Sequence, residues 1–221
     1  MRIPAPIVYV VEDDQALRSL IKALAQSIGM ATREFSSADG FLEHYDPRQP
    51  GCLVLDIFMP GMSGLELQDE LNRRGAVIPV IFITGHADVS SAVAAVRHGA
   101  FNYLQKPFRN SELIASVREA LELDRRSREM LAQQDAIRDR IASLTPRERE
   151  VLELIVRGLA SKVMAEEMGL SKRTVELHRS RVMDKMGASS IAQLVRMFMD
   201  SQRAGMACAK ILAAGLARRC R

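Results

Sequence analysis

Residues 52–64 read CLVLDIFMPGMSG, an apolar run that ends on a single carboxylate, Asp56, and passes directly into a glycine-rich turn. A buried aspartate that only supports the fold needs a basic neighbour or a helix to cap, and neither stands beside Asp56 in the sequence. Its partners must therefore come from elsewhere in the chain. Polar residues also follow the other strand-like runs of this half: Glu12 and Asp13 after 7–11, Thr84 at the end of 80–84, and Lys106 after 102–104.

Residues of these types can together perform phosphoryl chemistry. Three carboxylates close together repel one another, which raises the pKa of at least one of them unless a cation binds. Oxygen-only ligands suit Mg²⁺, which keeps several waters and accepts one or two carboxylates plus a phosphate. A carboxylate beside Mg²⁺ can attack a phosphoryl group to form an acyl phosphate, and Lys106 and Thr84 would neutralise and hydrogen-bond the new oxygens. Taken alone, a strand-end aspartate is more often a helix cap or a surface acid.

The segments that must position these residues alternate between strand and helix patterns. Apolar, β-branched strands buried on both faces are expected at 7–11, 52–56 and 80–84, with shorter strands at 31–35 and 102–104. Helices are expected at 15–28, from 63 onward with a capping-box sequence, and at 88–97. This alternation predicts a parallel sheet covered by helices on both faces. Ligands bind beyond the carboxyl ends of such strands, where the polar residues would meet.

Four segments of this half, VVEDD, LVLDIFMPGMSG, FITGHAD and YLQKPF, resemble the signature segments of response-regulator receiver domains. The resemblance implies a flavodoxin-like α/β fold, a five-stranded parallel sheet of order 2-1-3-4-5. It also implies phosphoryl transfer to Asp56 from a histidine of a partner sensor kinase, with Mg²⁺ as cofactor and Mn²⁺ as a substitute. The implied site residues are Asp13, Asp56 and the Phe58 main-chain carbonyl as metal ligands, Glu12 acting through a metal-bound water, Thr84 and Lys106 as catalytic partners, and Thr84 and Tyr103 as the switch pair.

Some residues keep a second interpretation. Glu12 stands where many members of that family have Asp. Without the resemblance, Tyr103 is equally a half-buried aromatic at a sheet edge, and His86 and His98 are interpreted as surface residues rather than metal ligands. A phosphatase of the haloacid-dehalogenase type would also use an aspartyl phosphate after a strand, but it needs a second acid two residues on, where this chain has Phe58.

A long helix is expected to leave this domain. From Ser111 to Pro146 there is no Pro or Gly, and apolar residues fall on a 3-4 spaced stripe that Ser116, Ser127 and Gln134 interrupt. The pattern predicts one helix that continues through a linker at 125–142. The alternative is a helix that breaks near Asp124–Arg128.

The rear half has the pattern of a helix-turn-helix domain. Thr145, Pro146 and Glu148 form a capping box with proline at the first helical position. Further helices are expected at 161–169, 171–187 and 189–203, and the turn before 171 contains Gly169. On a helical wheel of 171–187, one side is a core face of Val175, Val182 and Met186 with a packed His178 beside them. The other side carries Arg173, Leu177, Ser180 and Asp184, flanked by Glu176 and Arg181, and would face a DNA groove.

This half resembles the LuxR-type DNA-binding domain through TPREREVL and RTVELHRSRVMDKMG. The matching positions imply base-reading roles for Glu176, Leu177 and Ser180. They imply phosphate contacts for Lys162, Lys172, Arg173, Thr174, Arg181 and Lys185. The segment GLASKVMA departs from the commoner asparagine-containing form, which bears on Lys162.

Composition and charge fit two folded modules. The chain has 221 residues, 48% of them hydrophobic and 26% charged, which excludes global disorder. Residues 1–124 carry 11 basic and 16 acidic groups, a net charge of −5, and residues 125–221 carry 20 basic and 11 acidic groups, a net charge of +9. A basic rear half indicates an anionic partner. No apolar run is long enough for a membrane span, and the spacing of the three cysteines fits a reducing cytoplasm rather than a metal site.

Together the halves resemble a two-component response regulator of the NarL/FixJ type. The expected domains are a receiver at 1–124, a helical linker at 125–142, a LuxR-type helix-turn-helix domain at 143–203, and a basic tail at 204–221 whose role is open between docking and a frayed end. The expected function is that of a cytoplasmic transcription factor, not an enzyme beyond its own phosphotransfer and dephosphorylation. Phosphorylation would promote a homodimer that binds double-stranded promoter DNA. The alternative is a DNA-binding protein that works without phosphorylation.

Overall fold

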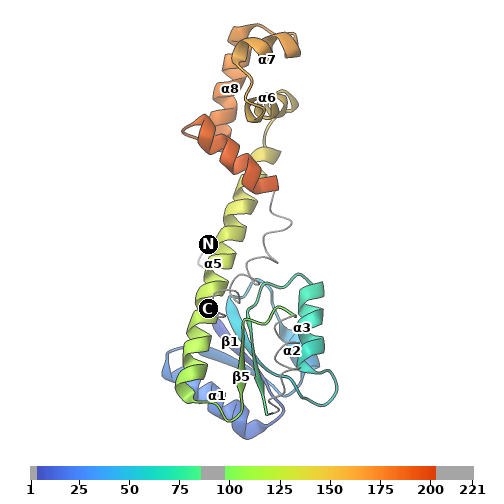
Figure 1. The fold of residues 1–221 in the computed structure, drawn as a ribbon, viewed down its shortest axis with the longest axis vertical. Coiled ribbons are helices and arrows are strands. Elements are labelled where there is room, and N and C mark those ends of the chain that lie inside the picture. The colour runs from blue at the N-terminus through green and yellow to red at the C-terminus, as the bar shows by residue number, and fades with distance from the viewer. Residues whose placement is uncertain (1–3, 86–97, 203–221) are drawn as a thin grey trace. The chain divides into compact units, whose positions relative to one another are not determined.

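The structure is a computed structural model of the chain in which residues 4–85 and 98–202 are described (Figure 1). These residues divide into two units at Arg128 and Glu129, and each unit has its own hydrophobic core. The helix expected at 88–97 and the tail at 204–221 lie outside the described residues. Within the described ranges, none of the helices combines the length and the apolar character that a membrane span requires.

The first unit is built on a parallel sheet of five strands in the order β2-β1-β3-β4-β5, as predicted. The strands are β1 (Ile7–Val11), β2 (Ala31–Phe35), β3 (Gly51–Asp56), β4 (Val80–Thr84) and β5 (Asn102–Gln105). Every residue of β3 and β4 is buried, which explains why both read as continuous apolar runs. The register sets Asp56 opposite Ile83 and Thr84 opposite Gln105, so the carboxyl ends of the strands form one edge.

Helices cover both faces of this sheet because side chains alternate along each strand. On one face, α1 (Gln15–Ser27) and the beginning of α5 (Asn110–Ala142) pack over a core that includes Val8, Val10 and Ile81. On the other face, α2 (Ala38–His44) and α3 (Gly64–Arg73) pack over a core that includes Tyr9 and Phe82. The capping box expected at the start of α3 is present, between Ser63 and Glu66.

The helix α5 is continuous over its 33 residues, so the alternative of a break near Asp124–Arg128 is wrong. These two residues instead anchor the helix. Asp124 is 1% exposed and accepts a hydrogen bond from the Gly51 main-chain N–H at 2.9 Å. Arg128 pairs with Asp124 at 2.9 Å and donates to the carbonyl oxygens of Pro47 and Gln49, both at 2.9 Å. The segment where a break was considered is therefore held by contacts with the start of β3 and the loop before it.

The second unit has the predicted helix-turn-helix order. Its helices are α6 (Pro146–Val156), α7 (Ser161–Met168), α8 (Lys172–Met186) and a further helix at 191–202. Gly169 ends α7 with φ +64°, a left-handed conformation that favours glycine, and Ser171 caps α8 by accepting from the Thr174 main-chain N–H at 3.1 Å. Val175 and Val182 are fully buried, which confirms the predicted core face of α8.

Candidate functional site

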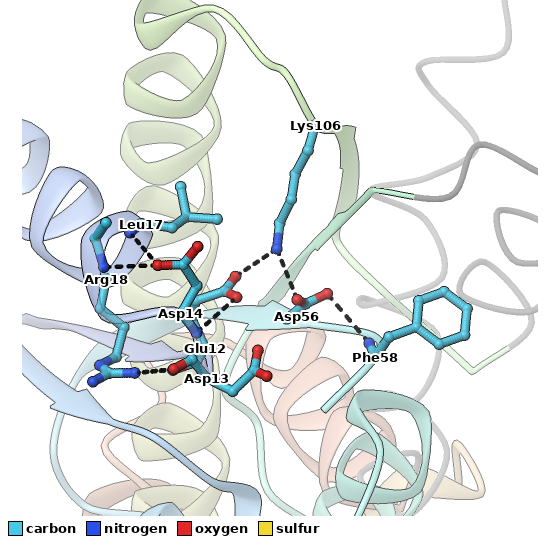
Figure 2. Close-up of polar contacts among 9 residues, drawn as sticks. Glu12, Asp13, Asp14, Leu17, Arg18, Asp56, Phe58 and Lys106 are labelled. Carbon is cyan, nitrogen blue, oxygen red and sulfur yellow. Dashed lines mark hydrogen bonds and ion pairs between the residues drawn. The ribbon is translucent and has the colours of Figure 1, made fainter. Parts of the chain in front are cut away.

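The sheet brings together the carboxylate that follows β1, the carboxylate that ends β3 and the ammonium that follows β5 (Figure 2). Lys106 Nζ lies 2.7 Å from Glu12 Oε2 and 2.7 Å from Asp56 Oδ2. Asp56, alone in its own stretch of sequence, thus finds its basic partner about fifty residues further along the chain. The Lys106–Pro107 peptide bond is cis.

Burial makes it costly for the acids at this edge of the sheet to carry a charge. Glu12 is 1% exposed and Asp56 is 5% exposed. Burial raises the pKa of Glu12 to about 7, and the nearby Asp56 charge also raises it, against the lowering effect of Lys106. Burial alone would lower the pKa of Lys106, but its hydrogen bonds to Asp56 and Glu12 outweigh that effect and raise the pKa. The charge of Glu12 therefore depends on its neighbours Asp56 and Lys106, and the charge of Lys106 depends on the two carboxylates that it contacts.

The acids at this edge fit a hard divalent cation. One oxygen each from Glu12, Asp13 and Asp56 can be chosen so that all three lie within 4.8 Å of one another. The Asp13 side chain is exposed, whereas those of Glu12 and Asp56 are buried. A set of oxygen donors alone, partly open to water, matches the preference of Mg²⁺. The residues present therefore fit the ion that the sequence predicted.

The other predicted residues of this site lie on β4, on β5 and in the turn after β3. Thr84 is fully buried as the last residue of β4, and its carbonyl accepts from the Lys106 main-chain N–H at 2.7 Å. Tyr103 lies on β5 opposite Phe82 and is half-buried. Phe58 is 52% exposed, and its main-chain N–H donates to Asp56 Oδ1 at 3.2 Å. The metal-ligand role of the Phe58 carbonyl and the switch roles of Thr84 and Tyr103 stay predictions.

The close approach of α3 to the end of β3 explains why residue 64 is glycine. A Cβ atom on Gly64 would stand 2.1 Å from the Asp56 carbonyl oxygen, a distance that no side chain tolerates. The missing side chain lets the start of α3 approach the end of β3, where the Gly64 N–H donates to the Ile57 carbonyl at 2.9 Å. The turn therefore positions the end of β3 as well as reversing the chain.

Two residues near the acids were missed by sequence reasoning. Asp14 caps α1 by accepting from the Ala16 main-chain N–H at 2.7 Å. Arg18 Nη1 donates to the Glu12 carbonyl oxygen at 2.6 Å and to the Asp13 carbonyl oxygen at 2.8 Å (Figure 2). An aspartate directly before a helical pattern is a recognisable cap signal. An arginine that binds main-chain carbonyls leaves no comparable pattern, because its partners are not side chains.

The second unit presents most of its predicted DNA contacts to solvent. Leu177, on the groove-facing side of α8, is 51% exposed. Thr174 is half-buried, and the other predicted contacts are exposed: Lys162, Lys172, Arg173, Glu176, Ser180, Arg181 and Lys185. His178 is half-buried with its Nδ1 atom inside the protein, as expected of a packed histidine. All nine contact assignments stay predictions.

Lys185 differs from the other predicted contacts because its ammonium already has a structural partner. Lys185 Nζ lies 2.6 Å from Glu148 Oε2 and 3.3 Å from the Ser143 carbonyl oxygen. Glu148 is the buried acid of the capping box at Thr145, and its bond to Lys185 holds the pKa of this carboxyl down at about 2. Lys185 therefore ties the end of α8 to the start of α6.

Comparisons with protein families cover both units. The family model described as the response regulator receiver domain matches residues 8–118. The model described as bacterial regulatory proteins of the luxR family matches residues 142–198. The two matches together span most of the described chain and correspond to the two units.

Individual relatives match over nearly the whole length. The transcriptional regulatory protein FixJ of Azorhizobium caulinodans is 48% identical over 193 residues, which are 86% of this chain and 90% of that protein. Nodulation protein W of Bradyrhizobium diazoefficiens is 44% identical over 191 residues, covering 86% of this chain and 84% of that protein. Among solved structures, the response regulator StyR superposes with a TM-score of 0.81 at 41% identity, covering 89% of this chain and 99% of the other.

Proposed function

This chain belongs to the response regulators that join a receiver domain to a LuxR-type DNA-binding domain, and from that membership we propose that Mg²⁺-dependent phosphorylation of Asp56 switches it as a transcription factor. A partner sensor histidine kinase supplies the phosphoryl group, and double-stranded promoter DNA is the target. We place the chain in the cytoplasm with these partners. Its catalysis is confined to its own phosphorylation and dephosphorylation.

The observation that carries the proposal is the position of Lys106 Nζ, 2.7 Å from oxygens of both Glu12 and Asp56. An Asp56 carboxylate oxygen attacks the phosphorus of the kinase phosphohistidine. The new O–P bond forms as the P–N bond breaks, and the imidazole nitrogen leaves with the electron pair and takes up a proton. Lys106 then pairs with a phosphoryl oxygen in place of the Asp56 oxygen that it holds now, and the Thr84 hydroxyl donates to another.

Asp13, Asp56 and the Phe58 carbonyl would hold the metal, and Glu12 would act on it through a water. When bound, Mg²⁺, or Mn²⁺ in its place, neutralises the negative charge that gathers on the phosphoryl oxygens. The chain's own contribution is to keep the acids at the right separation. Lys106 performs that task by standing between two buried carboxylates that would otherwise repel each other.

In the second unit, α8 enters the major groove with its exposed face toward the bases. Glu176, Leu177 and Ser180 read base edges, and Leu177 suits a thymine methyl group because it is apolar and exposed. The phosphate contacts are Lys162, Lys172, Arg173, Thr174 and Arg181. Lys185 is assigned here to positioning α8, since its ammonium is engaged by Glu148.

Phosphorylation acts on DNA binding through dimerisation in this proposal. Thr84 and Tyr103 move when the phosphoryl group forms, and the receiver surface that they reshape gains affinity for a second copy of the chain. A dimer doubles the phosphate contacts and reads two half-sites.

The deciding experiment is sedimentation velocity of the full chain and of Asp56→Asn, with and without Mg²⁺ and beryllofluoride, a phosphoryl mimic. A shift from monomer to dimer in wild type alone supports both the acceptor and the dimerisation. Mass spectrometry after incubation with a small-molecule phosphodonor separates the two claims. A wild-type chain that gains one phosphoryl group but stays monomeric keeps Asp56 as acceptor and contradicts dimerisation, and an Asp56→Asn variant that gains the group equally contradicts the acceptor.

A further inference from the structure

We propose that Arg18 is a positioning residue of the metal site, whose guanidinium holds the main chain of Glu12 and Asp13 so that both carboxylates face the Mg²⁺ position. The inference rests on the proposed function, because it concerns the ion of that same site. Arg18 contacts neither the metal nor the phosphoryl group and acts only through the loop that carries the acids.

The guanidinium of Arg18 contacts two main-chain carbonyl oxygens. Arg18 lies in the first turn of α1, and a single nitrogen, Nη1, donates to both the Glu12 carbonyl oxygen at 2.6 Å and the Asp13 carbonyl oxygen at 2.8 Å. These carbonyls lie between the end of β1 and the start of α1, outside strand and helix (Figure 2). Regular hydrogen-bond ladders therefore do not hold them, and the guanidinium takes that place.

The loop that carries Glu12 and Asp13 is also held at its start and at its end. The part that is left for Arg18 to hold is the main chain of Asp13. The Glu12 main-chain N–H donates to the Phe35 carbonyl of β2 at 3.2 Å, which fixes the start of the loop. Asp14 caps α1, which fixes its end. Asp13 stands between these two anchors with an exposed carboxylate, so the direction of that carboxylate depends on its main chain. Arg18 is the residue that holds the Asp13 carbonyl.

Binding of Mg²⁺ is sensitive to the position of the main chain at Asp13. The ion requires nearly ideal octahedral geometry with oxygens at about 2.0–2.1 Å, so a small rotation of the main chain at Asp13 moves a ligand oxygen out of place. Groups that orient metal ligands from outside typically account for about 10–100-fold in metal affinity. A charged hydrogen bond to a carbonyl is also stronger than a neutral one, which suits a residue that must hold a loop.

The same helix offers a matched control. Lys22 lies one turn further along α1 and pairs with Glu34 of β2 at 2.6 Å, away from the acid loop. Arg18→Met and Lys22→Met remove the same charge from the same helix, but only the first removes the contact with the loop. Arg18→Lys keeps the charge and one donor nitrogen on a shorter reach.

The test is the Mg²⁺ dissociation constant of the full, unphosphorylated chain, measured by isothermal titration calorimetry, with a thermal melt of each variant. We expect Arg18→Met to bind Mg²⁺ about tenfold more weakly, Arg18→Lys to lie in between, and Lys22→Met to stay within about twofold of wild type. In phosphorylation by a small-molecule phosphodonor, Arg18→Met should raise the half-saturating Mg²⁺ concentration by about the same factor. Its maximal rate should be unchanged, whereas a merely structural role would reduce the active fraction at every Mg²⁺ concentration.

Equal Mg²⁺ affinity in Arg18→Met and wild type would overturn the proposal. An equal loss in Lys22→Met would also overturn it, because the effect would then belong to the charge of α1. If Arg18→Met does not fold, Arg18→Lys decides: weakened binding supports the proposal and wild-type binding overturns it. A wild-type chain that binds no Mg²⁺ would contradict the proposed function together with this inference, so the two failures are distinguishable.

Discussion

At the scale of single residues, Lys106 links the chemistry of the first unit to its stability. The carboxylates of Glu12 and Asp56 are both buried, and each lies 2.7 Å from the same ammonium. Removing one partner of a buried ion pair leaves a charge without compensation, which is costly. The site is therefore held by the same electrostatic contacts that phosphorylation would rearrange.

The pH dependence of the free energy of unfolding should reveal the raised pKa of Glu12. Burial raises the pKa of this carboxyl to about 7 in the folded chain from 4.5. Between these values the folded chain binds more protons than the unfolded chain, so the free energy of unfolding falls as the pH rises from about 4.5 to about 7 and then levels off. The expected contribution is about 1–3 kcal/mol. Urea unfolding in EDTA at about pH 5 and about pH 8 measures it, and the part due to Glu12 should vanish in Glu12→Gln. The same pH dependence in both chains would contradict the prediction.

At the scale of elements, α5 shows where sequence patterns predict well and where they do not. The stripe of apolar residues and the absence of Pro and Gly predicted a long helix, and the helix is continuous. The alternative was a break near Asp124–Arg128, but both residues are engaged there by main-chain groups of the first residue of β3 and of the loop before it. A periodicity argument cannot find such a contact, because the partners are main-chain groups about eighty residues away in sequence.

The buried pair on α5 should matter far more than an exposed pair on the same helix. Arg128→Met leaves Asp124 buried without its cation, and the expected loss in the free energy of unfolding is about 3–5 kcal/mol. Arg125→Met removes an exposed pair with Glu122, and no measurable change is expected. Chemical denaturation of both variants provides the comparison. Equal stability of the two would show that the Asp124 anchor carries little of the fold.

Lys185 can be separated from the phosphate contacts by the salt dependence of DNA binding. Each lost phosphate contact reduces the slope of log K against log salt concentration by about 1. Arg181→Met should lower the slope by that amount, whereas Lys185→Met should leave the slope unchanged and lower the stability of the second unit. Fluorescence anisotropy over a series of salt concentrations distinguishes them. A reduced slope in Lys185→Met would restore this residue to the phosphate contacts.

At the scale of the whole molecule, the order of the elements and the edge of the sheet that carries the site were predictable. The alternation of strand and helix patterns predicted a parallel sheet with the polar residues at one edge, the family resemblance implied the strand order, and Lys106 meets Asp56 as expected. Contacts that use the main chain were not predictable, as Arg18 demonstrates. The ion pair of Lys185 with Glu148 was not predicted either, and the phosphate contact that the resemblance implied for this residue stays a prediction.

The division of charge along the chain gives a prediction for the full molecule. The net charge is −5 over residues 1–124 and +9 over residues 125–221, so we expect the DNA contacts to come from the rear half. If phosphorylation makes a dimer, the number of neutralised phosphates doubles, and the slope of log K against log salt concentration should become about twice as steep. Beryllofluoride with Mg²⁺ should produce this change in wild type and not in Asp56→Asn. An unchanged slope in wild type would mean that one copy binds DNA in both states.

The approach of Gly64 to Asp56 has a consequence for how such proteins diverge. The conflict created by any Cβ at position 64 involves the carbonyl oxygen of residue 56, so it does not depend on which side chain residue 56 carries. If Asp56 is the phosphoryl acceptor, a descendant without phosphorylation could lose the acids and Lys106, but it would still need this glycine to fold. Glycine at position 64 would therefore be retained wherever the fold is retained. The acids and Lys106 would be retained only where the phosphoryl chemistry is under selection.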